Sequence, residues 1–86
     1  MNETHNGWTN YATWRVNLEM FDNSPWRYEL PKDITPEQCQ EMVEDFIYDS
    51  ADNLVQGWAM AFLSEVNWHE IAEHMRDEIA EHLKEE

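Results

Sequence analysis

The sequence predicts an all-α fold, a compact three- to four-helix bundle formed by one acidic domain that spans residues 1–86. Apolar residues recur with the helical period in four segments, and two of these segments begin with N-terminal capping sequences. The chain contains only two glycines, so it has no flexible linker. Because typical domains contain about 100–150 residues, we expect a single domain.

The first expected helix covers about residues 10–22, with Thr9 or Asn10 as its N-cap. It is apolar on two faces, since Tyr11, Trp14, Leu18 and Phe21 share one side and Ala12, Val16 and Met20 share the other. A helix of this kind usually packs between other elements or contributes to an interface. We expect Tyr11 and Trp14 to enter the core.

Residues 23–34 are expected to form an extended aromatic loop. Trp26, Tyr28 and Leu30 alternate there with charged residues, which is the period of a strand. A single strand has no partner for its backbone groups. We therefore expect a loop whose three large side chains cover the core, with a small sheet as the alternative.

The second helix has the clearest start in the chain. The segment Thr35-Pro36-Glu37-Gln38 combines a capping Thr, a Pro at the first helical position and a Gln that completes a capping box. Its apolar face consists of Cys39, Met42, Val43, Phe46 and Ile47. This pattern predicts a helix that ends near residue 50.

Two further helices follow, over about residues 51–65 and 67–84. The third is expected to pack one side into the core, and this side carries Leu54, Val55, Trp58, Phe62 and Leu63. The fourth begins with a second capping sequence, Asn67-Trp68-His69-Glu70, and its apolar side carries Trp68, Ile71, Ala72, Met75, Ile79, Ala80 and Leu83. Trp14, Trp58 and Trp68 are interpreted as core residues.

The composition argues against several classes of protein. Five Lys and Arg stand against 19 Asp and Glu, giving a formal charge of −14. Direct binding of nucleic acid needs a basic surface, so we expect none, and we expect no binding to an anionic membrane. No apolar run approaches the roughly 20 residues of a membrane span, and no signal peptide is evident. With a single cysteine no internal disulfide can form, and a cytoplasmic location is expected.

The acidic residues are unevenly distributed. No Lys or Arg occurs between Lys32 and Arg76. On a helical projection, Glu37, Glu41, Glu44, Asp45 and Asp49 occupy one sector of the second helix, and the fourth helix repeats the pattern with Glu70, Glu73, Asp77, Glu78 and Glu81. We expect two parallel acidic rows. Each like-charge pair four residues apart destabilises a helix slightly, and the net charge exceeds the magnitude of about 2–8 that solubility needs.

The functional interpretation is that these rows imitate nucleic-acid phosphates and bind the basic groove of another protein. The expected contact residues are Glu37, Glu41, Glu44, Asp45, Asp49, Glu70, Glu73, Asp77 and Glu81. Such a contact would associate quickly and weaken with salt. The alternative is that both rows are only solvated helix faces.

Catalytic and metal-binding patterns are weak, so we expect a protein that is not an enzyme and needs no cofactor. His69 and His74 are five residues apart, whereas the zinc-protease helix requires four. A ladder of Glu70, His74, Glu78 and His82 at four-residue steps is interpreted as helix-stabilising pairs. A metal- or pH-responsive domain built on His74 and His82 remains as a third reading. Cys39, on the apolar face of its helix, is interpreted as a small buried hydrophobe.

The opening segment, from Asn6 to Leu18, reads Asn-Gly-Trp-Thr-Asn-Tyr-Ala-Thr-Trp-Arg-Val-Asn-Leu. It resembles the start of a group of small, largely uncharacterised proteins of bacteriophages and mobile elements, which begin with Gly-aromatic-x-Asn-Tyr-x-Thr-Trp-x-Val. The resemblance covers residues 7–16 and the residues around them, and Asn17-Leu18 departs from an aliphatic residue and Trp that often follow in the group. It implies a phage context, in which small acidic proteins frequently inhibit host proteins that bind nucleic acid.

The leading hypothesis is therefore a phage-associated inhibitor in the host cytoplasm, of the anti-CRISPR or anti-restriction type. It would bind the basic nucleic-acid-binding surface of a host defence or DNA-processing protein. The alternative is a non-enzymatic interaction module, or a homodimer, that uses an aromatic and apolar surface made of Trp8, Val16, Met20 and Trp26.

Overall fold

The computed structural model describes residues 4–22 and 24–84, apart from the side chains of Pro25 and Trp26. The elements are the α-helix α1 (Tyr11–Val16), the π-helix η1 (Asn17–Asp22), the 3₁₀-helix η2 (Pro25–Glu29) and the α-helices α2 (Pro36–Ser50), α3 (Asn53–Leu63) and α4 (Trp68–Lys84). Within the described residues there is no strand, only an isolated bridge between His5 and Trp8. The predicted all-α fold is confirmed.

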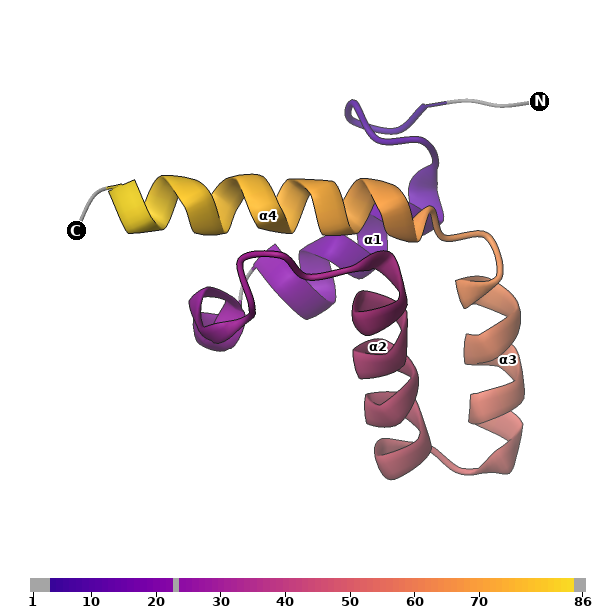
Figure 1. The fold of residues 1–86 in the computed structure, drawn as a ribbon. Coiled ribbons are helices and arrows are strands. Elements are labelled where there is room, and N and C mark those ends of the chain that lie inside the picture. Colours follow the sequence, from indigo (N-terminus) through magenta and orange to yellow (C-terminus); the bar gives the residue numbers. More distant parts are fainter. Residues whose placement is uncertain (1–3, 23, 85–86) are drawn as a thin grey trace.

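Helices α2 and α3 form an antiparallel hairpin, and α4 lies across one end of it (Figure 1). Helix α1 and η1 lie beside α4, so the core forms where α1, η1, α2 and α4 meet. The radius of gyration is 13.4 Å, against about 12 Å for a typical globular domain of this length. The difference arises because the α2–α3 hairpin extends away from the core.

The sequence signals for helix starts are confirmed. At α2, the backbone N–H of Gln38 donates to the Thr35 hydroxyl at 3.1 Å, and the Thr35 N–H donates to the Gln38 side chain at 2.9 Å. Asn10, rather than Thr9, caps α1, since its Oδ1 accepts from the Thr13 N–H at 2.9 Å. These bonds satisfy backbone groups that a helix start leaves without intrahelical partners.

The first helix buries a different face from the one expected. Ala12, Thr13 and Val16 are buried, whereas Tyr11 is 48% exposed and Trp14 is only half-buried. Thr13 explains the choice, because its hydroxyl accepts a hydrogen bond from the Asn67 N–H at 2.9 Å, just before α4. Small side chains on this face allow α1 and α4 to approach closely.

Residues 25–29 form a turn of 3₁₀-helix, so neither an extended loop nor a strand is correct there. The Arg27 N–H closes the turn on the Ser24 carbonyl at 3.2 Å. Leu30 packs against the core as expected, whereas Tyr28 does not, since its ring stacks instead on His82 of α4 at 3.9 Å between centroids. The Trp26 side chain lies outside the described part of the chain.

The core consists of buried side chains from α1, η1, α2, α4 and the segments between them. Its largest fully buried members are Phe21, Ile34, Ile71, Met75, Thr13 and Cys39. From the expected apolar face of α2, Cys39 and Val43 are buried, while Phe46 at the far end of the hairpin is 55% exposed. The prediction that Cys39 is a buried hydrophobe is confirmed.

Cys39 is expected to react very slowly with thiol reagents. Burial raises the pKa of the Cys39 thiol to about 11, an effect that the Arg76 charge only partly opposes. Against the ordinary pKa of 9.0, the folded protein holds about 100-fold less thiolate near neutral pH. Labelling with a chromogenic disulfide, with and without urea, measures this. The unfolded state loses its thiol proton first, so folding stability should fall as the pH rises from about 9 to about 11. Equal labelling rates with and without urea would contradict the burial of the Cys39 thiol.

Candidate protein-interaction surface

The acidic row on α2 faces solvent as predicted. Glu37, Glu41, Asp45 and Asp49 are all exposed, and they recur every four residues along the helix. Successive members therefore lie about 6 Å apart along the axis. Within residues 4–22 and 24–84, none of these four carboxylates makes an ion pair. The row is therefore a line of uncompensated negative charge.

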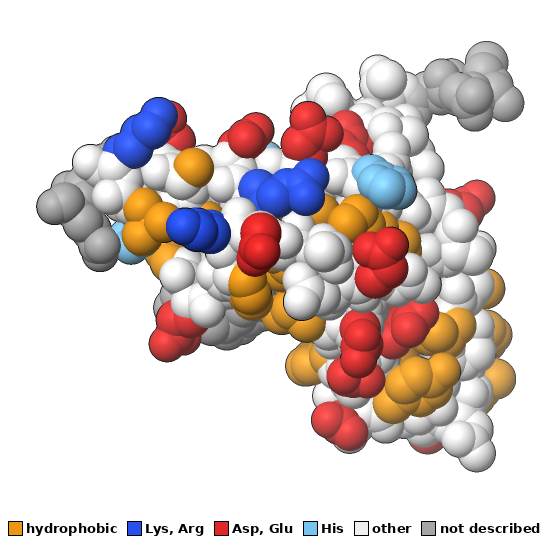
Figure 2. Space-filling view, viewed as in Figure 1, with side chains coloured by type: hydrophobic (Ala, Val, Ile, Leu, Met, Phe, Trp, Pro, Cys, Tyr) orange, Lys and Arg blue, Asp and Glu red, His pale blue; other side chains and the backbone are white. Residues whose placement is uncertain are grey.

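Glu44 stands at the edge of this row. It is half-buried, and its carboxylate accepts a hydrogen bond from the Gln40 amide at 3.0 Å. Figure 2 shows carboxylates gathered over α2 with no Lys or Arg among them. Basic side chains lie instead over α4 in the same view. The electrostatic character of the hairpin therefore differs from that of α4.

The α4 acids divide into two groups. Glu73, Asp77 and Glu81 are exposed, whereas Glu70 accepts the Thr9 N–H at 2.9 Å and so holds the N-terminal segment on α4. Glu78 lies 3.7 Å from Arg27. Because α4 lies across the hairpin (Figure 1), its row is not parallel to that of α2, contrary to the expectation of two parallel rows.

Helix α3 exposes large apolar side chains that its helical pattern predicts as core residues. Leu54 is 63% exposed and Trp58 70% exposed, and Val55 and Phe62 are also exposed. Only Leu63, at the C-terminal end of α3, is buried. Phe46 and Tyr48 are exposed as well, on different sides of α2. The exposed apolar residues of the hairpin, hereafter the hairpin apolar face, are Phe46, Tyr48, Leu54, Val55, Trp58 and Phe62.

The expected burial of this side of α3, including Trp58 as a core residue, was wrong for a physical reason. A chain of 86 residues can enclose only one small core, and α1, η1, α2 and α4 form most of it, so that α3 contributes only Leu63 and the partly buried Met60. Along most of its length helix α3 has α2 beside it (Figure 1), and near its C-terminal end the Phe62 ring packs edge-on against Tyr11 of α1, with 6.4 Å between ring centroids. One signal was available in the sequence: α3 contains no charged residue, so no polar face marks which side meets solvent.

The alternative apolar surface of Trp8, Val16, Met20 and Trp26 is not assembled as proposed. Val16 is buried, so it is not available for contact. Trp8 and Met20 are partly buried and pack against the core. Trp26 has its side chain outside the described residues. An apolar contact surface exists, but it lies on the hairpin.

The four residues of the predicted ladder, Glu70, His74, Glu78 and His82, do not all contact one another. Glu70 holds Thr9, and His82 stacks on Tyr28. His74 and Glu78 remain together, with Nε2 and Oε1 3.4 Å apart. The interpretation of the ladder as helix-stabilising pairs is confirmed only for His74 and Glu78.

Comparison with known proteins adds a family and no close relative. A search of curated proteins and a search of solved structures find no match. Among the described residues, no helix is both long and apolar enough to span a bilayer. The family described as "Family of unknown function (DUF7249)" matches residues 1–86. Because this match covers the whole chain, the protein belongs to the DUF7249 family.

Proposed function

We propose that this protein is a non-enzymatic inhibitor that binds the basic nucleic-acid-binding surface of another protein through α2. The observation that carries the proposal is the exposed, unpaired row of Glu37, Glu41, Asp45 and Asp49. Its spacing of about 6 Å is comparable to the roughly 7 Å between successive phosphates of one strand. A groove that binds phosphates would therefore meet carboxylates at a similar interval.

The partner's chemistry follows from the charge. The hairpin contains no Lys or Arg, and the whole chain has a formal charge of −14. A second copy of the chain would bring the same charge to the contact, whereas a basic groove is complementary to it. Electrostatic complementarity of this kind raises the association rate and disfavours wrong partners.

The hairpin apolar face extends this contact. It shares α2 with the acidic row and continues over α3, and Figure 2 shows hydrophobic side chains beside the carboxylates. Trp, Phe and Tyr side chains are frequent among the residues that dominate binding energy. We propose that the carboxylates enter the basic groove while Trp58 and its neighbours contact an apolar shoulder of the same partner.

The biological context comes from the opening segment. Its resemblance to phage and mobile-element proteins favours a host target, of the class of defence nucleases or DNA-processing proteins, in the host cytoplasm. The resemblance supplies the context, and the α2 row supplies the mechanism.

The proposal is tested by competition. Purified protein should displace DNA or guide RNA from such a target, and the displacement should weaken as salt rises because exposed charges are screened within about 10 Å at 0.1 M salt. The measurement is fluorescence anisotropy of a labelled oligonucleotide across a salt series. Displacement that does not depend on salt would contradict phosphate mimicry and would favour the apolar contact alone.

Light scattering distinguishes the remaining alternative. A mass that corresponds to the monomer leaves the hairpin apolar face free for a partner. If the wild type has the mass of a dimer and Trp58→Ser has the mass of a monomer, the face is a homodimer interface instead.

A further inference from the structure

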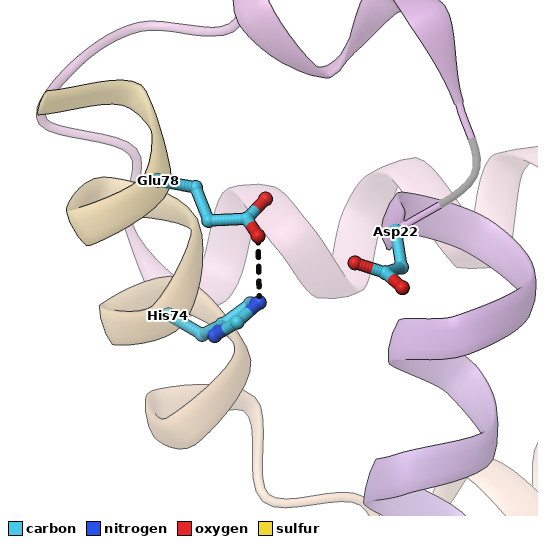
Figure 3. A group of neighbouring side chains, drawn as sticks. All are labelled: Asp22, His74 and Glu78. Atoms are coloured by element: carbon cyan, nitrogen blue, oxygen red, sulfur yellow. Dashed lines mark ion pairs between the residues drawn. The ribbon is translucent and has the colours of Figure 1, made fainter. Parts of the chain in front are cut away.

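We propose that Asp22, His74 and Glu78 form a binding site for one divalent transition-metal ion, with Zn²⁺ as the preferred ion. The site lies between η1 and α4, away from the acidic row on α2, and it is independent of the proposed inhibitor function. Figure 3 shows the Asp22 side chain on η1 facing His74 and Glu78 on α4.

The distances suit a metal ion. One ligand atom from each of the three residues lies within 4.8 Å of the others. His74 Nε2 and Glu78 Oε1 are 3.4 Å apart, which is about the separation of two ligands bound tetrahedrally to Zn²⁺ at 2.0–2.1 Å. Only the Asp22 carboxylate, which is exposed and free to rotate, needs to move to complete the set.

Unpartnered polar atoms point to a missing ligand. His74 Nε2 is buried and lies 3.4 Å from Glu78 Oε1, yet it makes no hydrogen bond in the described part of the chain. Asn17 gives independent evidence: it is only 5% exposed, yet its Oδ1 is without a hydrogen-bond partner there. Asn17 lines a hollow of about 160 Å³ together with Asp22 and His74, and Glu78 lies next to this hollow through its contact with His74. A buried acceptor without a partner is costly, and an ion with its bound water would satisfy it.

The π-helix explains how Asn17 and Asp22 reach the same hollow. In an α-helix, residues five positions apart point about 140° away from each other. The i→i+5 geometry of a π-helix brings them to nearly the same side. Helix η1 covers Asn17–Asp22, so its two ends are these two residues. Single π-helical turns occur frequently at functional sites.

Neighbouring groups hold the ligands in place. The Trp8 ring packs edge-on against His74, with 5.0 Å between ring centroids. Glu78 presents Oε1 to His74 and Oε2 to Arg27, whose Nε lies 3.7 Å away. Arg27 is itself held by the Ser24 carbonyl at 2.9 Å and the Tyr28 hydroxyl at 3.1 Å. Glu78 can therefore bind the ion through one oxygen while Arg27 orients the other, a common outer-shell arrangement.

The ligand types select the ion. Mg²⁺ and Ca²⁺ prefer oxygen ligands alone, whereas an imidazole nitrogen favours Zn²⁺ and its transition-metal neighbours. Two carboxylates also balance the charge of a divalent cation. Mn²⁺ stands lowest in the usual affinity order of the divalent first-row metals, so it should bind more weakly than Zn²⁺.

Calorimetric titration of the full chain with ZnCl₂ tests the site. Excess Mg²⁺ and physiological salt occupy the exposed carboxylates, which bind cations without selectivity. We expect one Zn²⁺ per chain, and a rise in Tm of roughly 10–20 °C when Zn²⁺ is at 100 times its Kd. Asp22→Asn should weaken Zn²⁺ binding by at least about 10-fold while leaving the metal-free Tm unchanged, because Asp22 is exposed. His74→Gln is the second variant, and Co²⁺ added to the wild type should give visible d–d absorption that both variants lose.

Matched controls are Asp77→Asn and His69→Gln, which alter exposed residues of α4 outside the three ligands. Both should bind Zn²⁺ like the wild type. The proposal is overturned by a wild type that binds no Zn²⁺ under these conditions. It is also overturned if Asp22→Asn and His74→Gln bind Zn²⁺ as tightly as the wild type. The same holds if the two control variants lose as much Zn²⁺ affinity as Asp22→Asn and His74→Gln.

Discussion

Phe21→Ala is expected to lower the free energy of unfolding by about 3–5 kcal/mol, the cost of truncating a buried Phe. Phe21 is fully buried, and it lies at the end of η1 where that element meets the core. Total stability for a domain of this size is about 4–13 kcal/mol, so the variant should lose a large part of it. Urea denaturation followed by circular dichroism measures the change.

Phe46→Ala is the matched control, because it removes the same atoms from a side chain that is 55% exposed. The expected loss is below about 1 kcal/mol, since exposed substitutions seldom have larger effects. Comparable losses in the two variants would show that the end of the hairpin is packed in solution and that the hairpin apolar face is not free.

Reversing two charges on α2 should weaken inhibition more than any other surface change. Glu41→Lys with Asp45→Lys places two cations in the middle of the exposed row. In a basic groove each substitution replaces an attraction with a repulsion, so we expect more than a 10-fold loss of affinity, or above about 1.4 kcal/mol. Competition against a labelled oligonucleotide, with the salt dependence recorded, measures the effect.

Asp77→Lys with Glu81→Lys supplies the control on α4, with the same spacing and the same change in net charge. Helix α4 lies across the hairpin, so its row and that of α2 do not line one straight groove. The α4 variant should therefore lose less affinity than the α2 variant. Equal losses would mean that only overall charge matters, and unchanged inhibition by the α2 variant would refute mimicry by that row.

The cap at Thr35 and the acidic row of α2 were both predictable from the sequence because each depends on residues close together in the chain. A capping box needs four consecutive residues, and a row on one helix needs only the helical period. The prediction that this row is exposed also holds when the predicted helix packing is wrong, because most acidic side chains of a chain with a net charge of −14 face solvent in any fold.

Phe46 and Trp58 could not be placed in the same way. Their spacing on an apolar helix face is the spacing of core residues, and whether that face is covered depends on how many helices the core can hold. Asp22 and His74 show the same limit, because they are 52 positions apart in the sequence and come together only where η1 packs beside α4.

The amino-acid sequence alone therefore determined the four α-helical segments, the caps at Asn10 and Thr35 and the negative charge of α2, because these follow from neighbouring residues. Tertiary structure alone decided which apolar face stays uncovered and which distant polar groups meet. These features depend on the packing of α4 across one end of the α2–α3 hairpin, which leaves most of α3 against α2 alone and places η1 beside His74.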